Sequence, residues 1–193
     1  MVKDALINFL LNSNLVTKEA ALKIAEPFQN KVIDKLHFQL KEGKICNEYL
    51  FLQRGFMRSY AIDIDGNEVT TNFYWDNNVV FEVSSFFKRT PSKENIQCLT
   101  ACEGWVITYD QLNMLFHTLP EFREFGRSIL VNNLTALKSR MLSMITETAE
   151  ERYEHLLKRN PEIFQFAPLK YIASYLGVTD TSLSRIRKEF LKK

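Results

Sequence analysis

Residues 172–190, IASYLGVTDTSLSRIRKEF, hold two short apolar-periodic segments that meet at a single glycine. Gly177 can adopt the positive φ angle that a sharp turn between two helices requires. In the second segment Leu183, Ile186 and Phe190 repeat at helical spacing, which can hold this helix on the first one. The pattern therefore predicts a helix-turn-helix at this point of the chain.

The second helix of this pair has a polar face that its apolar residues leave exposed. Small polar groups stand at its N-terminal end and cations stand further along: Thr179, the expected N-cap, then Asp180, Thr181, Ser184, Arg185 and Lys188. A helix fits the major groove of DNA with its first residues near base edges and its cations near phosphates. We therefore expect a DNA-binding surface here; the alternative is an ordinary solvated helical face.

The overall composition is that of a globular protein. The chain has 193 residues, 46% of them hydrophobic, and a net charge of +2, which is too small to indicate a nucleic-acid partner. Residues 169–193, however, contain six basic residues and two acidic ones. No run approaches the roughly 18 apolar residues of a membrane span, and the N-terminus lacks a signal-peptide pattern. We expect a cytoplasmic protein with no membrane partner.

Residues 49–109 have the pattern of β-strands. The segments YLFLQRGFMRSYAI, EVTTNFYW, ENIQCLTA and GWVITY are rich in aromatic and β-branched residues, and turn signals separate them. In DIDGNE, the pair Asp65-Gly66 suits the tight turn of a hairpin. Before this region, residues 1–47 read as helical at their start. The sequence thus predicts a β domain that helices flank.

A long helix is predicted to follow from Pro120, because no glycine or proline interrupts residues 127–160. It carries a heptad seam of about two repeats, formed by Leu130, Leu134, Leu137, Met141 and Met144. This seam can pair the helices of two subunits; the alternative is that it covers the β domain. Thr148 and Glu151 form a capping box that begins a new helix, which Asn160-Pro161 ends.

The C-terminal segments TAEERYEHLLKRNPE and PLKYIASYLGVTDTSLSRIRKEF resemble the winged helix-turn-helix end of the Crp/Fnr family of bacterial transcription regulators, in the versions common in Bacteroidetes. FLQRGFMRSYAIDIDGNEVTTNFYW is similar to the early strands of that family's cyclic-nucleotide-binding roll. The resemblance implies an α+β fold: an N-terminal β-roll, which is a cyclic-nucleotide-binding-like jelly roll, with flanking helices over residues 1–118, a long dimerisation helix over 119–146 and a C-terminal helical winged helix-turn-helix domain over 147–193.

The same resemblance implies partners and contact residues. The expected partners are double-stranded DNA with an inverted-repeat operator, a second copy of the chain in a homodimer, and RNA polymerase. The family pattern places Thr179 and Lys188 as phosphate contacts, and the base-reading positions fall on Asp180, Thr181, Ser184 and Arg185. Many relatives begin this helix with an Arg-Glu pair where the present chain has Asp180-Thr181. Their operator sequence is therefore not carried over.

The family's cyclic-AMP cassette corresponds to VVFEVSSFFKRTPSKENIQCL in this chain. The cassette needs a glycine-rich turn with a Glu and, some ten residues on, an Arg that binds the cyclic phosphate. In this chain Glu82 occupies the position of the cassette's Glu. The glycines of the cassette are missing, and Arg89 or Lys93 would have to replace its Arg. With Ser84 and Ser85 these residues make a degenerate effector pocket, which we expect not to bind cyclic AMP; another small effector or none are the alternatives.

Other functions find little support in the sequence. It contains no nucleophile elbow, P-loop or HExxH motif, so we do not expect an enzyme. Three scattered cysteines are too few for an iron–sulfur cluster and are expected to be reduced packing residues, and solitary histidines give no haem or metal site. The functional alternative is a ligand-binding regulatory module that acts on a protein partner through its last helices.

Overall fold

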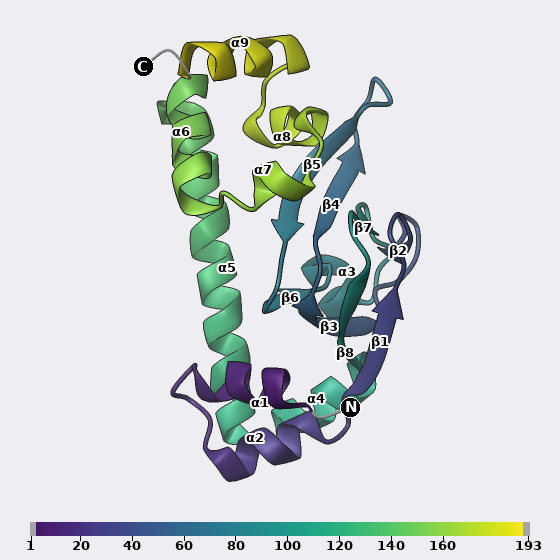
Figure 1. The fold of residues 1–193 in the computed structure, drawn as a ribbon. Helices are drawn as coiled ribbons and strands as arrows, with labels where there is room; N and C mark the ends of the chain where they lie inside the picture. The colour runs from purple at the N-terminus through teal and green to yellow at the C-terminus, as the bar shows by residue number, and fades with distance from the viewer. Residues whose placement is uncertain (1–2, 191–193) are drawn as a thin grey trace.

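Two short helices open the described part of the chain, which runs from residue 3 to residue 190 in the computed structural model. α1 (Asp4–Leu11) and α2 (Lys18–Ala25) pack against each other at one end of the molecule (Figure 1). The Thr17 hydroxyl begins α2 by accepting a hydrogen bond from the Ala20 amide at 3.3 Å. The helical start predicted for the chain is confirmed.

A β-roll follows, made within the described residues of two four-stranded antiparallel sheets. The orders are β1-β8-β3-β6 and β2-β7-β4-β5. The elements are β1 (Gln29–Ile33), β2 (Phe38–Leu40), β3 (Glu48–Arg54), β4 (Met57–Ile62), β5 (Glu68–Tyr74), β6 (Asn78–Val80), α3 (Val83–Lys88), β7 (Asn95–Cys98) and β8 (Cys102–Thr108). The predicted β domain is therefore confirmed, and β1, β2, β6 and α3 are additions that the sequence pattern does not predict.

The turns of the roll follow from the glycines. Between β4 and β5, Gly66 has a φ of +84°, and the Asp63 carboxylate accepts hydrogen bonds from the Asp65 and Asn67 amides at 2.9 and 2.8 Å. Between β3 and β4, Gly55 has a φ of +124°, and a Cβ atom there would lie 2.6 Å from the Cys102 sulfur. Only glycine fits this second turn, because both the backbone angle and the neighbouring sulfur exclude a side chain.

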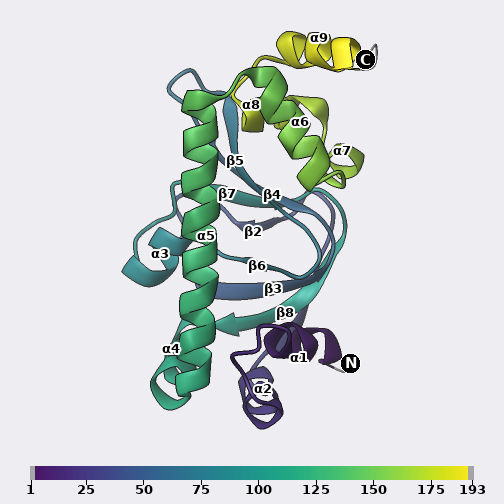
Figure 2. The same ribbon diagram turned by 90° about the vertical axis from the view of Figure 1, so that its left-hand side faces the viewer.

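A long helix leads away from the roll. α4 (Tyr109–Thr118) begins with a capping box of Thr108 and Gln111, and α5 (Pro120–Thr146) has its proline in the first turn. Near its start Phe122 and Phe125 are buried, and Phe125 meets the Phe9 ring of α1 edge-on at 5.7 Å. Beyond these residues α5 runs along one side of the roll for the length of the molecule (Figure 2).

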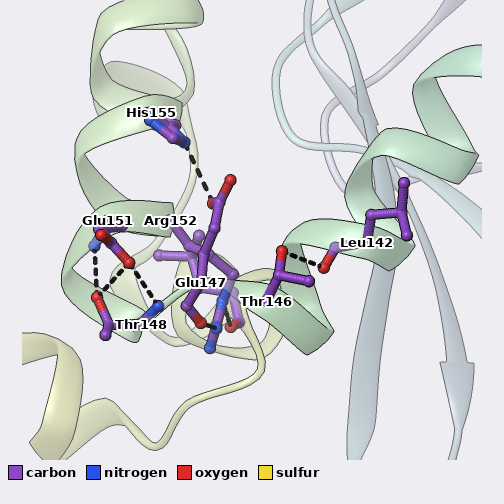
Figure 3. Close-up of polar contacts among 8 residues, drawn as sticks. Leu142, Thr146, Glu147, Thr148, Glu151, Arg152 and His155 are labelled. Atoms are coloured by element: carbon purple, nitrogen blue, oxygen red, sulfur yellow. Dashed lines mark hydrogen bonds and ion pairs between the residues drawn. The ribbon is translucent and has the colours of Figure 1, made fainter.

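The chain turns sharply after α5, and four helices follow: α6 (Ala149–Arg159), α7 (Ile163–Phe166), α8 (Leu169–Leu176) and α9 (Asp180–Phe190). At the turn the Thr148 amide donates to Glu151 at 2.8 Å, and the Glu151 amide donates to the Thr148 hydroxyl at 3.2 Å (Figure 3). The Arg152 guanidinium donates to the Glu147 carbonyl at 2.6 Å and to the Leu176 carbonyl at 3.1 Å. The predicted capping box is confirmed. Arg152 connects this turn to the C-terminal end of α8 through its two hydrogen bonds.

Residues 3–190 contain no strand after β8, so the wing of the predicted winged helix-turn-helix is not part of the structure described here. Over the same residues, no helix combines the length and the apolar character that crossing a membrane requires.

Candidate DNA-binding surface and effector cavity

The turn between α8 and α9 is built around Gly177, which has a φ of +69°. The Gly177 amide donates to the Ser174 carbonyl at 3.1 Å and the Val178 amide to the Ala173 carbonyl at 3.0 Å. These two bonds close α8 as a Schellman motif, in which a left-handed residue satisfies the last carbonyls of a helix. The chain can therefore turn directly into α9.

α9 is fixed by its cap and by its apolar face. The Thr179 hydroxyl accepts a hydrogen bond from the Ser182 amide at 3.2 Å, so Thr179 is the N-cap that the sequence predicts. Leu183 and Ile186 are buried with residues of α6 and α8, and the Phe190 ring meets Tyr153 edge-on at 5.6 Å. This packing determines which face of α9 remains outside.

The outer face of α9 carries the predicted polar set. Each of its members is exposed: Thr179, Asp180, Thr181, Ser184, Arg185 and Lys188. In the described part of the chain neither the Arg185 nor the Lys188 side chain has a hydrogen-bond or ion-pair partner. α9 also lies at the end of the molecule opposite α1 and α2 (Figure 1). The structure thus brings the polar set together on one accessible helix face.

The predicted seam on α5 is also exposed in the single chain. Between 37% and 66% of each side chain is accessible in Leu130, Leu134, Leu137, Met141 and Met144. Val131, Leu142 and Ile145 on the same helix are accessible too. The covering of the roll falls to Phe122 and Phe125 instead.

A cavity of about 500 Å³ lies between the roll and α5. Its walls include Glu82 and Glu94 from the roll, Asn133 and Arg140 from α5, and Tyr175 from α8. Burial raises the pKa of Glu94 above its ordinary value; a hydrogen bond from Thr71 opposes this, and the nearby Glu82 carboxylate adds to it. The cavity is therefore lined by the roll, by α5 and by the C-terminal helices, and two carboxylates lie in its wall.

Arg140 connects this cavity to the C-terminal helices. Its guanidinium donates to the Thr71 carbonyl of β5 at 2.6 Å and to the Tyr175 carbonyl of α8 at 3.0 Å, and lies 4.1 Å from the centre of the Tyr175 ring. Ser174 of α8 adds to the junction, because its hydroxyl accepts from the Thr70 amide at 2.7 Å. β5 is the edge strand of its sheet, so α8 here takes the place of a neighbouring strand.

A second contact of the same junction buries a cation. Arg58 of β4 is fully buried, and its guanidinium lies 3.3 Å from the ring centre of Tyr171 on α8 and 4.1 Å from that of Tyr60. It pairs with Glu68, while its Nε and Nη1 atoms have no hydrogen-bond partner among the described residues. The aromatic rings thus stabilise this guanidinium through cation–π contact.

Comparisons with known proteins agree with this architecture. Residues 35–118 match the family model of the cyclic nucleotide-binding domain. The anaerobic regulatory protein of Haemophilus influenzae is 23% identical over 85% of this chain and 67% of its own length. The fumarate and nitrate reduction regulatory protein of Yersinia pestis is also 23% identical, over 85% of this chain and 69% of its own length.

Solved structures show the same fold. FixK2 from Bradyrhizobium japonicum superposes with a TM-score of 0.73 at 16% identity, covering 86% of this chain and 85% of that one. A transcriptional regulator of the Crp/Fnr family from Eubacterium rectale gives a TM-score of 0.72 at 14% identity, covering 95% and 88%. The chain therefore shares the fold of these structures. The predicted fold class, an α+β roll with a long helix and C-terminal helices, is confirmed.

Within this fold, only one of the five residues predicted for the effector pocket lines the cavity. Glu82 lines the cavity, and its carboxylate caps α3 by accepting hydrogen bonds from the Ser84 and Ser85 amides at 3.0 and 2.6 Å. The Arg89 guanidinium donates to the Cys46 carbonyl at 2.9 Å and lies over the Tyr109 ring. Ser84, Ser85, Arg89 and Lys93 are not in the cavity wall.

Two charged residues of the described cavity wall, Glu94 and Arg140, are absent from the predicted set. Asn133, Ala136, Leu137 and Arg140 all line the cavity, at successive spacings of three, one and three. These spacings describe one face of a helix. The sequence thus contains a signal for Arg140, whereas for Glu94 we see no local signal, because its approach to Glu82 depends on the roll.

Proposed function

We propose that this chain is a homodimeric, sequence-specific DNA-binding transcription regulator of the Crp/Fnr type. The exposed face of α9 carries this proposal: it is a capped helix, held by its apolar side, with two cations that have no side-chain partner among residues 3–190. Cations of this kind neutralise phosphates and release counterions, and side chains near the start of such a helix reach base edges. Thr179 and Lys188 contact phosphates, and the base-reading residues are Asp180, Thr181, Ser184 and Arg185.

We further propose a division of labour along the chain. Residues 1–118 form the sensory domain, residues 119–146 the dimerisation helix and residues 147–193 the DNA-binding domain. The seam from Leu130 to Met144 pairs with that of a second copy, which would bury apolar side chains that the single chain leaves exposed. A twofold axis through the seam relates two α9 helices, so the operator is an inverted repeat.

The effector cavity does not bind cyclic AMP. A cyclic phosphate there would meet the carboxylates of Glu82 and Glu94, and the cation in the described cavity wall, Arg140, already donates to backbone carbonyls. Calorimetry with cyclic AMP is expected to give no binding at micromolar concentration, and DNA binding without the nucleotide. Micromolar affinity that is lost in Glu82→Gln would overturn this part of the proposal.

Salt dependence tests DNA binding against docking of a protein partner. One phosphate-contacting cation, Lys188, in each of two half-sites gives about two phosphate neutralisations, hence a slope of about −1.8 in log K against log salt concentration. Fluorescence anisotropy with duplex DNA should then show about 10-fold weaker binding at 200 mM salt than at 50 mM. Binding that changes less than about threefold over this range would instead favour an apolar docking surface on the last helices.

A further inference from the structure

Cys98 and Cys102 form a pair of thiols at the point where the chain passes from one sheet of the roll to the other. Cys98 ends β7 and Cys102 begins β8, with three residues between them. Both are free and buried, at 0% and 2% exposure, and both lie near the Phe56 carbonyl, which accepts a hydrogen bond from the amide directly after Cys98 and lies 3.7 Å from the Cys102 sulfur. Cys46, the other cysteine of the chain, has its sulfur 3.5 Å from the Glu48 carbonyl.

The backbone around the pair is held by Phe56. The Leu99 amide donates to the Phe56 carbonyl at 2.7 Å, and the Phe56 amide donates to the Thr100 hydroxyl at 2.9 Å. The Cys102 sulfur lies 3.4 Å from the Thr100 carbonyl and 3.7 Å from that of Phe56. The connection between the two cysteines is therefore held against the backbone of Phe56, whose carbonyl also lies beside the Cys102 sulfur.

Cys102 has a route to small molecules, and Cys98 lies behind it. A cavity of about 740 Å³ between the roll and α7 has Cys102 in its wall, together with Trp75, Thr100, Glu162 and Phe166. Cys98 is not part of that wall. Interaction with the side chains of Cys98 and Thr100 lowers the pKa of the Cys102 thiol against the opposing effect of burial, whereas interaction with Cys102 and burial both raise the pKa of Cys98. Cys102 is therefore the thiol that reacts first, since the thiolate is the nucleophile.

We propose that Cys102 and Cys98 are a redox site, which a hydroperoxide converts to a reversible intramolecular disulfide. The Cys102 thiolate attacks the peroxide, so that a sulfur–oxygen bond forms, the oxygen–oxygen bond breaks and an alcohol or water leaves. The Cys98 sulfur then attacks the sulfenic sulfur of Cys102, and the hydroxyl group leaves as water with the thiol proton. Two thiols are oxidised, one hydroperoxide is reduced, and a dithiol reductant reverses the change.

The position of the pair connects this chemistry to the C-terminal helices. Phe56, whose backbone holds the connection between the cysteines, packs its ring 5.5 Å from Phe166 of α7 and 5.6 Å from Phe73. A disulfide draws the two sulfurs to bonding distance and so displaces this connection and the ring that depends on it. Oxidation therefore shifts the packing of the roll against the helix-turn-helix and, if the proposed function holds, the affinity for DNA.

Mass spectrometry of the full chain tests the site without reference to DNA. Reduced protein treated with hydrogen peroxide should lose about 2 Da, and a digest should contain a peptide link between Cys98 and Cys102. Cys46→Ser should behave in the same way, whereas Cys98→Ser should gain about 16 Da as a sulfenic acid on Cys102, which dimedone then traps. An unchanged mass of the wild-type protein, dimedone on Cys46 alone, or a link between two chains would overturn the proposal.

The link to DNA binding is measured separately on the same samples. We expect the oxidised and reduced forms to differ at least fivefold in affinity for duplex DNA, with Cys46→Ser showing the same difference and Cys98→Ser none. Equal affinities with the disulfide formed would overturn the coupling while leaving the redox site in place. Absence of DNA binding in both forms would contradict the proposed function, and the mass measurement would still decide the disulfide.

Discussion

Replacement of Arg140 by alanine should loosen the C-terminal helices from the roll. The guanidinium makes three hydrogen bonds across this junction, to Thr71 at 2.6 Å, to Tyr175 at 3.0 Å and to Thr70 at 3.4 Å, and it lies over the Tyr175 ring. Arg140→Ala removes all four contacts at once. It also leaves partly buried carbonyls of β5 and α8 without their donor.

The size of the effect follows from these contacts. A hydrogen bond to a charged group contributes about 1.5–3 kcal/mol and a cation–π contact about 0.5–2 kcal/mol. The sum is not reached, because the contacts share one side chain and the Nε atom of Arg140 is already buried without a partner. We expect a net loss of about 2–4 kcal/mol in the docking of α8 for Arg140→Ala, and of about 1–2 kcal/mol for Arg140→Lys, which keeps the charge without the planar fork.

Arg127→Ala is the matched control, because Arg127 lies on the same helix and pairs with Glu124 in solvent. Exposed pairs of this kind contribute about 0–1 kcal/mol. Urea unfolding gives the difference in stability, and amide exchange locates it: the Thr70 amide, which donates to Ser174, should exchange faster in Arg140→Ala than in Arg127→Ala. If the two variants lie within about 0.5 kcal/mol of each other, with equal exchange at Thr70, the role given to Arg140 is wrong.

Three further predictions concern the seam, the cavity and α9. Leu137→Glu should sediment as a monomer at micromolar concentration while Lys138→Glu remains dimeric; a monomeric unmodified protein would refute the pairing. Because burial raises the pKa of Glu94, the stability that its protonated form gives is lost as the pH rises above about 4.5 and through the folded-state pKa. Glu94→Gln should therefore flatten the fall of unfolding free energy with pH, and an identical pH profile in the variant would contradict the assignment. On a preferred DNA site, Arg185→Ala should weaken binding by about 1–3 kcal/mol and relax preference at one base pair per half-site. Lys188→Ala should weaken binding to all sequences alike and reduce the salt slope by about one per lost contact, so equal, sequence-independent losses from both variants would exclude this division of roles.

The features that the sequence predicts well are those with local causes. Gly177 needs only its own backbone freedom, Thr148 and Glu151 cap each other within one turn, and Leu183 and Ile186 repeat at the period of a helix. The strands of residues 49–109 are predicted for the same reason, because their apolar residues follow one another along the sequence in short runs between turn signals.

The features that sequence patterns miss depend on distant partners. β1 is exposed along most of its length, and it is a strand because it pairs with β8. Its own residues show no alternation of apolar and polar side chains that would predict a strand. Arg89 was expected in the effector pocket, but it ends α3 in a left-handed conformation with a φ of +56° and donates to the chain near Cys46. Whether such a side chain faces the cavity depends on how α3 packs, and no spacing in the sequence encodes that packing.

Selection of bound sequences from random duplex DNA by the purified full chain tests the central claim most directly, because it reports recognition and symmetry together. We expect enrichment of an inverted repeat whose half-sites are about 10 base pairs apart, or a whole number of helical turns, with the enrichment lost when Arg185 is replaced by alanine. No enrichment above the starting library, or a preferred site without twofold symmetry, would contradict the proposal that two α9 helices of a homodimer read DNA.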